Sequence, residues 1–158
     1  MEVIVRKAIM EDGAAVIKLL YQIAEQHQKG RADLFKEMNN KYSINDFYTK
    51  LDDDRKPMFV AVDENNNVLS YVFCMIINYK NHYVFNDYRS LYIDDICVDE
   101  HVRRQKIGTL LMDSVCDFAR KTGCYNIDLN VWEFNEGAKS FYKKYGLKTQ
   151  RRRMELIL

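Results

Sequence analysis

The sequence predicts an α/β domain in which helices cover a mixed β-sheet. In several segments apolar residues alternate with polar ones, the two-residue period of strands, and in others they recur with helical spacing. In the second half of the chain strands are followed by helices, which requires a parallel crossover, whereas the first half contains a hairpin. No linker, repeat or low-complexity tract divides the chain, so residues 1–158 are expected to form a single domain.

The predicted elements of the first half are a strand at 2–8, helices at 12–30 and 43–51, and strands at 58–62 and 68–78. Asp12 is the expected N-terminal cap of the first helix, which Gly30 ends. Ser43, with Asp46 three residues later, has the spacing of a capping box. Because asparagine tolerates left-handed backbone angles, the Asn-rich run 64–67 predicts the turn of a hairpin.

The predicted elements of the second half are a strand at 88–98, a helix from near Gly108 to Gly123, a strand at 125–131, a helix from Asn135 to Gly146, and a strand at 147–158. Glycine at a helix end supplies the left-handed backbone that caps it. In the last strand Met154, Leu156 and Leu158 share one face. A single long last strand leaves a sheet edge free for a second copy, so we expect a homodimer.

The composition excludes several classes of protein. The chain has 24 Lys and Arg against 23 Asp and Glu, and a formal net charge of +1 is unlike a nucleic-acid-binding surface. No window has the roughly 18 continuous apolar residues of a membrane span, and the charged N-terminus is unlike a secretory signal. The four cysteines form no Cys-x-x-Cys pair. We therefore expect a cytoplasmic protein with reduced thiols, no metal site, and neither a membrane nor a nucleic acid as partner.

A basic loop stands between a predicted strand and the strongest predicted helix. Residues 103–108 read Arg-Arg-Gln-Lys-Ile-Gly, and the helix begins at their end. A helix N-terminus carries unpaired N–H groups and about half a positive charge, which favours bound anions. The three cationic side chains add charge-assisted donors that suit a phosphate. The alternative interpretation is a solvated basic turn without a ligand.

Two segments resemble signatures of the Gcn5-related N-acetyltransferase (GNAT) superfamily. The loop 103–108 resembles the pyrophosphate-binding pattern Arg/Gln-x-x-Gly-x-Gly/Ala, with Lys106 at the position of the first glycine. We expect Lys106 to keep the loop conformation with a negative φ. Residues 130–147 are similar to the second pattern, Asn-x-x-Ala-x-x-Phe-Tyr-x-x-x-Gly-Phe. The resemblance is specific over residues 90–147, where one helix and one strand separate the two signatures.

The resemblance implies the GNAT fold and a co-substrate. This fold is a mixed, mostly antiparallel sheet of six or seven strands with helices on both faces. Its central strands, here about 91–98 and 125–131, splay apart and admit the pantetheine of acetyl-CoA. The residues expected to bind acetyl-CoA are Cys97, Val98, Arg103, Arg104, Gln105, Lys106, Ile107, Gly108, Thr109, Asn130, Asn135 and Tyr142. No pattern marks Cys97 as activated, so we expect a small buried residue and direct transfer without a covalent intermediate.

The resemblance also assigns a catalytic acid and base. Tyr142 matches the tyrosine that protonates the leaving thiolate, and the alternative is a packed aromatic residue on a helix. Residues 92–95, Tyr-Ile-Asp-Asp, resemble the Tyr-Leu-Glu-Asp of diamine (spermidine/spermine-type) acetyltransferases, whose acidic side chains line the polyamine site. Adjacent strand residues point to opposite faces unless a bulge intervenes. Asp94 is the favoured base, with Asp95 or water as alternatives.

The acceptor wall of the family corresponds here to residues 27–45 and 79–89. The candidate substrate-binding residues are His27, Asp33, Phe35, Tyr79, Tyr83 and Asp94. The predicted function is direct transfer of an acetyl group from acetyl-CoA to a primary amine of a small molecule or polyamine. The alternatives are a protein N-terminal or lysine acetyltransferase and a non-catalytic acyl-CoA-binding sensor.

Overall fold

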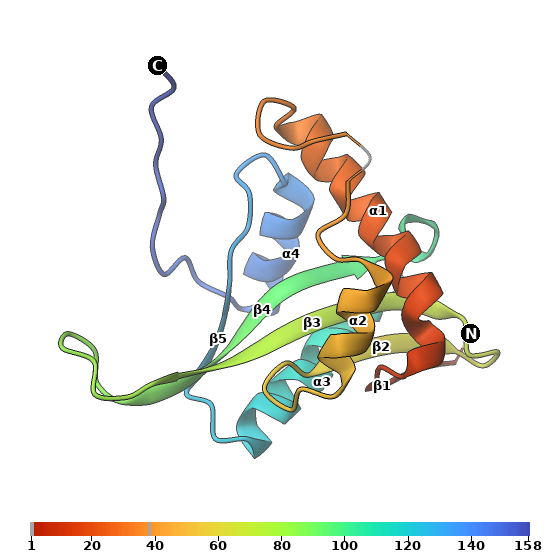
Figure 1. The fold of residues 1–158 in the computed structure, drawn as a ribbon, viewed down its shortest axis with the longest axis horizontal. Helices are drawn as coiled ribbons and strands as arrows, with labels where there is room; N and C mark the ends of the chain where they lie inside the picture. Colours follow the sequence, from red (N-terminus) through yellow and green to blue (C-terminus); the bar gives the residue numbers. More distant parts are fainter. Residues whose placement is uncertain (1, 38) are drawn as a thin grey trace.

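The computed structural model describes residues 2–37 and 39–158, which form one sheet with helices on both faces (Figure 1). The strands are β1 Val3–Lys7, β2 Met58–Asp63, β3 Val68–Tyr79, β4 Tyr88–Val98 and β5 Asn126–Leu129. The α-helices are α1 Gly13–Gly30, α2 Ile44–Leu51, α3 Ile107–Lys121 and α4 Glu136–Tyr145, and short 3-10 turns lie at Met10–Asp12 and Glu100–Val102. Among the described residues no helix is long and apolar enough to cross a bilayer.

The sheet follows the chain in the order β1-β2-β3-β4-β5. The first three pairs of neighbours are antiparallel, and β4 and β5 are parallel, with α3 as the crossover between them. The predicted mixed, mostly antiparallel sheet is therefore confirmed. The expectation of six or seven strands is wrong for the part of the chain that the structure describes, which contains five.

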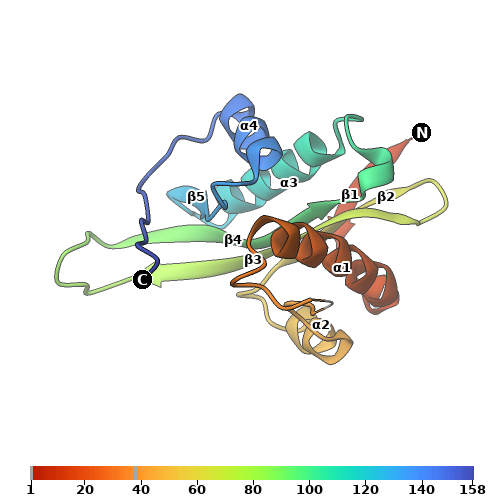
Figure 2. The ribbon, with the colours of Figure 1, turned by 90° about the horizontal axis from the view of Figure 1, so that it is seen from above.

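The hydrophobic core has one layer on each face of the sheet. Helices α1 and α2 cover one face, and α3 and α4 cover the other (Figure 2). Fully buried residues under α1 and α2 include Val16, Leu20, Phe47 and Tyr71, and those under α3 include Leu91, Leu111 and Val115. Because residues four apart lie on the same side of a helix, each helix turns one apolar stripe toward the sheet.

Strand β5 pairs with β4 over its whole length, whereas β4 pairs with β5 only over its first half. The parallel register runs from Ser90 opposite Asn126 to Ile93 opposite Leu129. Strand β4 continues to Val98, whereas β5 ends, so β5 is shorter than the predicted strand at 125–131. The splay between the central strands therefore begins after Ile93 and leaves the last five residues of β4 with one open edge.

A β-bulge lies where the splay begins. The register shifts between Phe73 and Cys74 of β3, and Asp94 of β4 has no residue opposite it. A bulge interrupts the alternation of side chains between the two faces of a sheet. Asp94 bonds to the segment that precedes α2, and Asp95 bonds to Tyr71 beneath α1. Both carboxylates therefore lie on the α1–α2 face, where strict alternation would have separated them.

Residues 147–158, the last predicted strand, do not form a strand. This C-terminal segment runs extended and stands apart from the sheet on the β5 side (Figure 1). Beyond Leu147, no backbone hydrogen bond joins it to another described residue. A strand forms only where a neighbour satisfies its N–H and C=O groups. The alternation of apolar residues at 147–158 therefore does not by itself produce a strand.

The predicted cap at Ser43 is confirmed, whereas Asp12 occupies the N-cap position of α1 without a capping hydrogen bond from its side chain to that helix. The Ser43 hydroxyl accepts from the backbone of Asp46, whose carboxylate accepts from the Ser43 N–H in return. Asp12 instead accepts from the Arg6 guanidinium at 2.7 and 2.9 Å and from the Ile9 N–H at 2.8 Å. Because the Asp12 side chain is buried, its charge needs that pairing.

Candidate active site

A basic loop connects the end of β4 to the start of α3. The side chains of residues 103–106 are exposed, and Arg103 donates from Nε to the carbonyl oxygen of Val98 at 3.3 Å. The first hydrogen bonds of α3 are donated by the N–H groups of residues 109 and 110 to the carbonyl of Lys106. The N–H groups of Ile107 and Gly108 precede these bonds. The loop therefore combines a helix N-terminus with cationic side chains, which suits a phosphate group.

Lys106 adopts a left-handed backbone conformation, with φ 63° and ψ 8°. The expectation of a negative φ at Lys106 is wrong. The chain turns sharply here from the 3-10 turn into α3, and glycine makes such a turn without a clash at Cβ. A non-glycine residue in this region costs about 1–3 kcal/mol. The loop thus carries an ammonium group at a position where the backbone favours glycine.

Replacement of Lys106 by glycine should stabilise the protein and weaken the binding of the acetyl-CoA that the sequence resemblance implies. Relief of the left-handed strain should raise the melting temperature by about 2–4 °C per kcal/mol gained. Loss of the ammonium should raise the Kd for acetyl-CoA. Lys144→Gly is the matched control, because it removes an exposed lysine from α4 and should lower the melting temperature. A lower melting temperature for Lys106→Gly would contradict the strain argument.

The open edge of β4 presents backbone amides to the splay. The N–H of Asp99 donates to the carbonyl oxygen of Leu69 at 2.9 Å, on the β3 side. Because successive N–H groups of a strand point to opposite sides, the N–H of Cys97 also turns toward β3 and that of Val98 turns toward the splay. The Cys97 side chain is buried in the core beneath α1, and burial raises the pKa of its thiol to about 12. Cys97 therefore has no character of a nucleophile.

Polar and packing contacts hold α4 across the opening from β4. Asn135 Oδ1 accepts from the first turn of α4 at 3.1 Å, as expected of a cap, and also from Gln26 of α1 at 3.2 Å. Asn130, just beyond β5, donates to a tyrosine hydroxyl of β4 at 3.0 Å. A Cβ on Gly108 would lie 3.3 Å from Phe141 of α4. The start of α3, the end of β4 and α4 therefore meet closely around the opening.

Tyr142 lies on α4 beside this opening. Its side chain is largely buried, and burial, with a further contribution from the negative charge of Asp95, raises the pKa of its phenol well above the usual value. The phenol is therefore protonated throughout the neutral range. No described protein group forms a hydrogen bond with its hydroxyl, which leaves the proton available to a ligand.

Asp94 serves as an anchor for the segment that precedes α2. Lys41 donates from Nζ to the Asp94 carboxylate and to its carbonyl oxygen, both at 2.8 Å, and the Tyr42 hydroxyl donates to the other carboxylate oxygen. Burial, followed by the bond to Asp94, raises the pKa of Tyr42. Both carboxylate oxygens of Asp94 are thus engaged. Its predicted role as the base stays a prediction.

Asp95 has the properties of a proton acceptor. It accepts one hydrogen bond from the Tyr71 hydroxyl, at 3.1 Å. Burial raises the pKa of its carboxyl to about 6, although the charge of Lys41 and the Tyr71 bond act in the opposite direction. A carboxyl with this pKa is mostly ionised at pH 7 and still basic enough to take up a proton. Its negative charge also contributes to the raised pKa of Tyr142.

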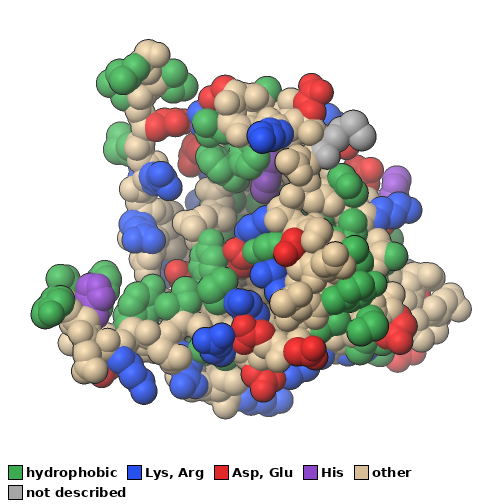
Figure 3. Space-filling view, viewed as in Figure 1, with side chains coloured by type: hydrophobic (Ala, Val, Ile, Leu, Met, Phe, Trp, Pro, Cys, Tyr) green, Lys and Arg blue, Asp and Glu red, His purple; other side chains and the backbone are tan. Residues whose placement is uncertain are grey.

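An aromatic cluster walls the opening between the end of α1 and the segment that follows β5. Ring centroids are 5.2 Å apart for His27 and Phe35, 5.2 Å for Phe35 and Trp132, and 5.9 Å for Trp132 and Phe134. Burial, assisted by the charge of Lys41, lowers the pKa of His27 and so favours the neutral imidazole. Figure 3 shows apolar side chains gathered between the end of α1 and the C-terminal segment.

The structure brings only part of the predicted acceptor wall together. His27 and Phe35 lie in the aromatic cluster, but Tyr79 and Tyr83 belong to the β3–β4 hairpin, which projects away from α1 (Figure 1). Tyr79 stacks on Tyr88 at 4.5 Å, and Tyr83 is fully exposed. Asp33 is exposed as well and is bonded to a neighbouring arginine.

Several residues around the opening were missed by the sequence reasoning. They are Lys41, Tyr42, Tyr71, Trp132 and Phe134. Tyr71 occupies an ordinary alternating position of a strand. Nothing at that position indicates that its hydroxyl bonds to the carboxylate of Asp95. Lys41 and Tyr42 directly precede the capping box at Ser43, and that position next to a helix start is the one signal that could have drawn attention to them.

Comparisons with known proteins agree with these features. A model of the acetyltransferase (GNAT) family matches residues 28–147, more than half of the chain. The probable N-acetyltransferase san of Drosophila melanogaster is 37% identical over 83 residues, which are 52% of this chain and 42% of that protein. Glucosamine 6-phosphate N-acetyltransferase of Trypanosoma brucei brucei is 33% identical over 67 residues, which are 42% of this chain and 44% of that protein. The chain spans less than half the length of these curated relatives.

A solved structure matches over nearly the whole chain. A mutant of the BH1408 protein of Bacillus halodurans superposes with a TM-score of 0.94 at 29% sequence identity, covering 98% of this chain and 99% of that one. The fold described above is therefore shared along the full length of that protein.

Proposed function

The chain belongs to the acetyltransferase (GNAT) family, and on that basis we propose that it transfers the acetyl group of acetyl-CoA directly to a primary amine of a small molecule. One observation carries this proposal. A basic loop at a helix N-terminus, an open strand edge, a partly buried tyrosine and a partly buried carboxylate lie around the splay between β4 and β5. These are the groups that thioester aminolysis requires.

Acetyl-CoA would extend from the basic loop toward Tyr142 and Asp95. Its pyrophosphate fits residues 103–108 and the first N–H groups of α3, with the hydroxyl of Thr109 at the same helix end. Its pantetheine fits the edge of β4 that β5 leaves open, between Val98 on one side and Asn130 and the helix cap Asn135 on the other. The cationic side chains of the loop are exposed, and none of them forms an ion pair with another described residue. Both observations support this placement.

The proposed reaction is a direct displacement at the thioester carbonyl. The neutral amine attacks the carbonyl carbon, a C–N bond forms, and the oxyanion accepts a hydrogen bond from the N–H of Val98. Asp95 takes the proton that the amine loses. The C–S bond then breaks, and Tyr142 gives its proton to the thiolate of coenzyme A. We favour Asp95 over Asp94 because Lys41 and Tyr42 occupy both oxygens of Asp94.

A small cationic amine suits the acceptor side of this opening. The Asp95 carboxylate attracts an ammonium group, and aromatic faces stabilise cations within about 6 Å. The relative from Trypanosoma brucei brucei, by its name, acetylates an amino sugar phosphate. Polyamines remain a proposed acceptor class, supported by the similarity of residues 92–95 to the diamine acetyltransferases.

Acetyl-CoA should raise the melting temperature of the protein. At a ligand concentration of about 100 times Kd, mass action stabilises the folded state by about 2.7 kcal/mol, or roughly 5–10 °C for a chain of this size. Differential scanning fluorimetry with acetyl-CoA, and with free acetate as control, measures the shift. The absence of a shift at millimolar acetyl-CoA would overturn the assignment of the co-substrate.

An amine panel with thiol release as the readout tests the acceptor. Polyamines, amino sugars, aminoglycosides, amino acids and peptide N-termini should be compared, and turnover is expected with a small amine. Turnover with peptides alone would instead indicate a protein acetyltransferase. A thermal shift with acetyl-CoA but no turnover of any amine would indicate an acyl-CoA-binding sensor.

A further inference from the structure

Helix α1 turns two glutamines toward the opening between β4 and α4. Gln22 donates from Nε2 to Asp99 Oδ1 at 3.3 Å and accepts from the N–H of Glu100 at 3.2 Å, both in the turn that follows β4. Gln26, one helical turn further along, donates from Nε2 to Asn135 Oδ1 at 3.2 Å. Residues four apart lie on the same side of a helix. This side of α1 therefore contacts the end of β4 at one point and the start of α4 at the other.

The hydrogen bonds determine which atoms of Gln26 and Asn135 remain free. A backbone N–H can only donate, so the bond from Ala138 at 3.1 Å identifies the accepting atom of Asn135 as its oxygen. Gln26 must then donate to that oxygen with its nitrogen. The other polar atom of each side chain, Gln26 Oε1 and Asn135 Nδ2, has no partner among the described residues. The half-buried pair thus presents a free acceptor beside a free donor.

A free acceptor beside a free donor matches a secondary amide. The N–H of such an amide can donate to Gln26 Oε1 while its C=O accepts from Asn135 Nδ2. The pantetheine arm of coenzyme A contains two secondary amides, and amides that leave water without new partners cost free energy. The path proposed above for the arm, along the open edge of β4 between Val98 and Asn135, passes this pair of side chains.

We propose that Gln26, together with Asn135, binds an amide of the pantetheine arm, an assignment that rests on the proposed function because it takes acetyl-CoA as the donor. Gln26 lies outside both sequence signatures, on a helix that precedes them. Its bond to Asn135 persists when the arm binds, because the arm uses the two atoms that are free. Gln26 therefore positions the donor and takes no part in the transfer of protons.

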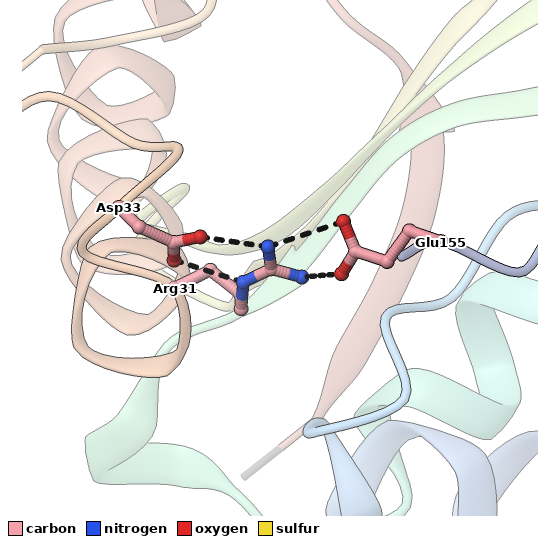
Figure 4. Close-up of polar contacts among 3 residues, drawn as sticks. All are labelled: Arg31, Asp33 and Glu155. Atoms are coloured by element: carbon pink, nitrogen blue, oxygen red, sulfur yellow. Dashed lines mark hydrogen bonds and ion pairs between the residues drawn. The ribbon is translucent and has the colours of Figure 1, made fainter. Parts of the chain in front are cut away.

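The end of α1 is held in place without the bond to α4. Arg31, directly after α1, forms paired hydrogen bonds with Asp33 and with Glu155 (Figure 4). Gly30 packs so closely on Phe134 that a Cβ at this glycine would collide with the ring. Loss of the glutamine side chain should therefore leave the helix where it is, so its substitution tests binding and not folding.

Calorimetric titration with coenzyme A and with its nucleotide half tests the proposal. Gln26→Leu keeps the approximate size of the side chain but can neither donate nor accept, so it should raise the Kd for coenzyme A by about tenfold. The Kd for 3′-phospho-ADP, which lacks the arm, should not change. Gln28→Leu is the matched control, since Gln28 is also half-buried on α1 but lies on another side of the helix, and it should change neither Kd.

The side-chain NH2 signals of the unmodified chain supply a second measurement by NMR. The signals of Gln26 and Asn135 should shift when coenzyme A is added and should stay in place with 3′-phospho-ADP. An equal rise of both Kd values in Gln26→Leu would overturn the proposal, because it would indicate damage to the fold. An unchanged Kd for coenzyme A would overturn it as well but would leave acetyl-CoA as the co-substrate. If the unmodified chain binds neither ligand, the proposed function fails and the role of Gln26 fails with it.

Discussion

Tyr142→Phe should lower the turnover number by about 10²–10⁴-fold, the usual contribution of a positioned general acid. The change removes one hydroxyl from a side chain whose ring packs on α4, so the fold and the binding of acetyl-CoA should be nearly unchanged. The raised pKa keeps the phenol protonated at neutral pH, which is the form that can protonate a thiolate. Steady-state kinetics of thiol release, with the Kd of acetyl-CoA measured separately, distinguish lost chemistry from lost binding.

Tyr145→Phe is the matched control for this prediction. Tyr145 lies one turn away on α4, and its hydroxyl donates to Asp113 at 2.6 Å and contacts Cys116 at 3.4 Å, both on α3. Its loss should therefore lower the melting temperature and spare turnover. If both variants reduced turnover equally, the effect would be structural, and an unchanged rate for Tyr142→Phe would remove its role as the acid.

The local elements of the fold could be predicted because their causes lie within a few residues. The capping box at Ser43 and Asp46 uses a three-residue spacing, and Asn135 caps α4 in the same way. Gly123 and Gly146 end their helices with left-handed φ values of 70° and 117°, as glycine at a helix end predicts. The crossover from β4 through α3 to β5 follows from the order of strands and helices.

The features that could not be predicted depend on contacts between distant segments. The bulge at Asp94 is a property of the β3–β4 register, and one inserted residue decides whether two neighbouring carboxylates share a face. The Asp12 side chain does not bond to the helix that it precedes, because it pairs with Arg6 on β1. The strand at 147–158 was predicted from its own alternation, but a strand also needs a paired neighbour, and beyond Leu147 this segment forms no backbone hydrogen bond with another described residue.

Part of the candidate site could be predicted because its residues lie close together in the sequence. The basic loop and Tyr142 belong to contiguous signatures, and the structure places both beside the splay. The left-handed φ of Lys106 contradicts the expectation, because it arises from the path of the chain between a 3-10 turn and α3 and not from the lysine. Asp94 and Asp95 differ because of their surroundings. Lys41 and Tyr42 bond to Asp94, whereas burial raises the pKa of Asp95.

Asp95→Asn should abolish most of the activity and remove the acid limb of the pH profile. A base must be ionised to accept a proton, so kcat/KM of the unmodified chain should rise with pH through about 6, the pKa of the buried carboxyl. Asparagine cannot take up that proton, and the loss should reach about 10²–10⁴-fold at neutral pH. A profile that retains its inflection near pH 6 would transfer the role to Asp94 or to water.

Asp94→Asn separates the two carboxylates. It keeps the size of the side chain but loses the charge that pairs with Lys41 and weakens the bond from Tyr42. We expect a higher KM for the amine, because the segment before α2 loses its anchor on β4, while the inflection of kcat/KM near pH 6 remains. Loss of that inflection in Asp94→Asn alone would identify Asp94 as the base.

Asp95→Asn should also stabilise the protein at neutral pH. Burial raises the pKa of Asp95 from 3.8 to about 6 in the folded chain, so ionisation favours the unfolded state. The folded state therefore has its full stability from this group below pH 4 and loses up to about 3 kcal/mol as the pH rises through 6. Asp95→Asn does not ionise, so its melting temperature should exceed that of the unmodified chain at pH 7, with the difference shrinking toward pH 4. A gain in stability together with a loss of activity is the result expected of a carboxylate kept ionised in a buried site for chemistry, whereas a loss of both would mean that Asp95 mainly supports the structure.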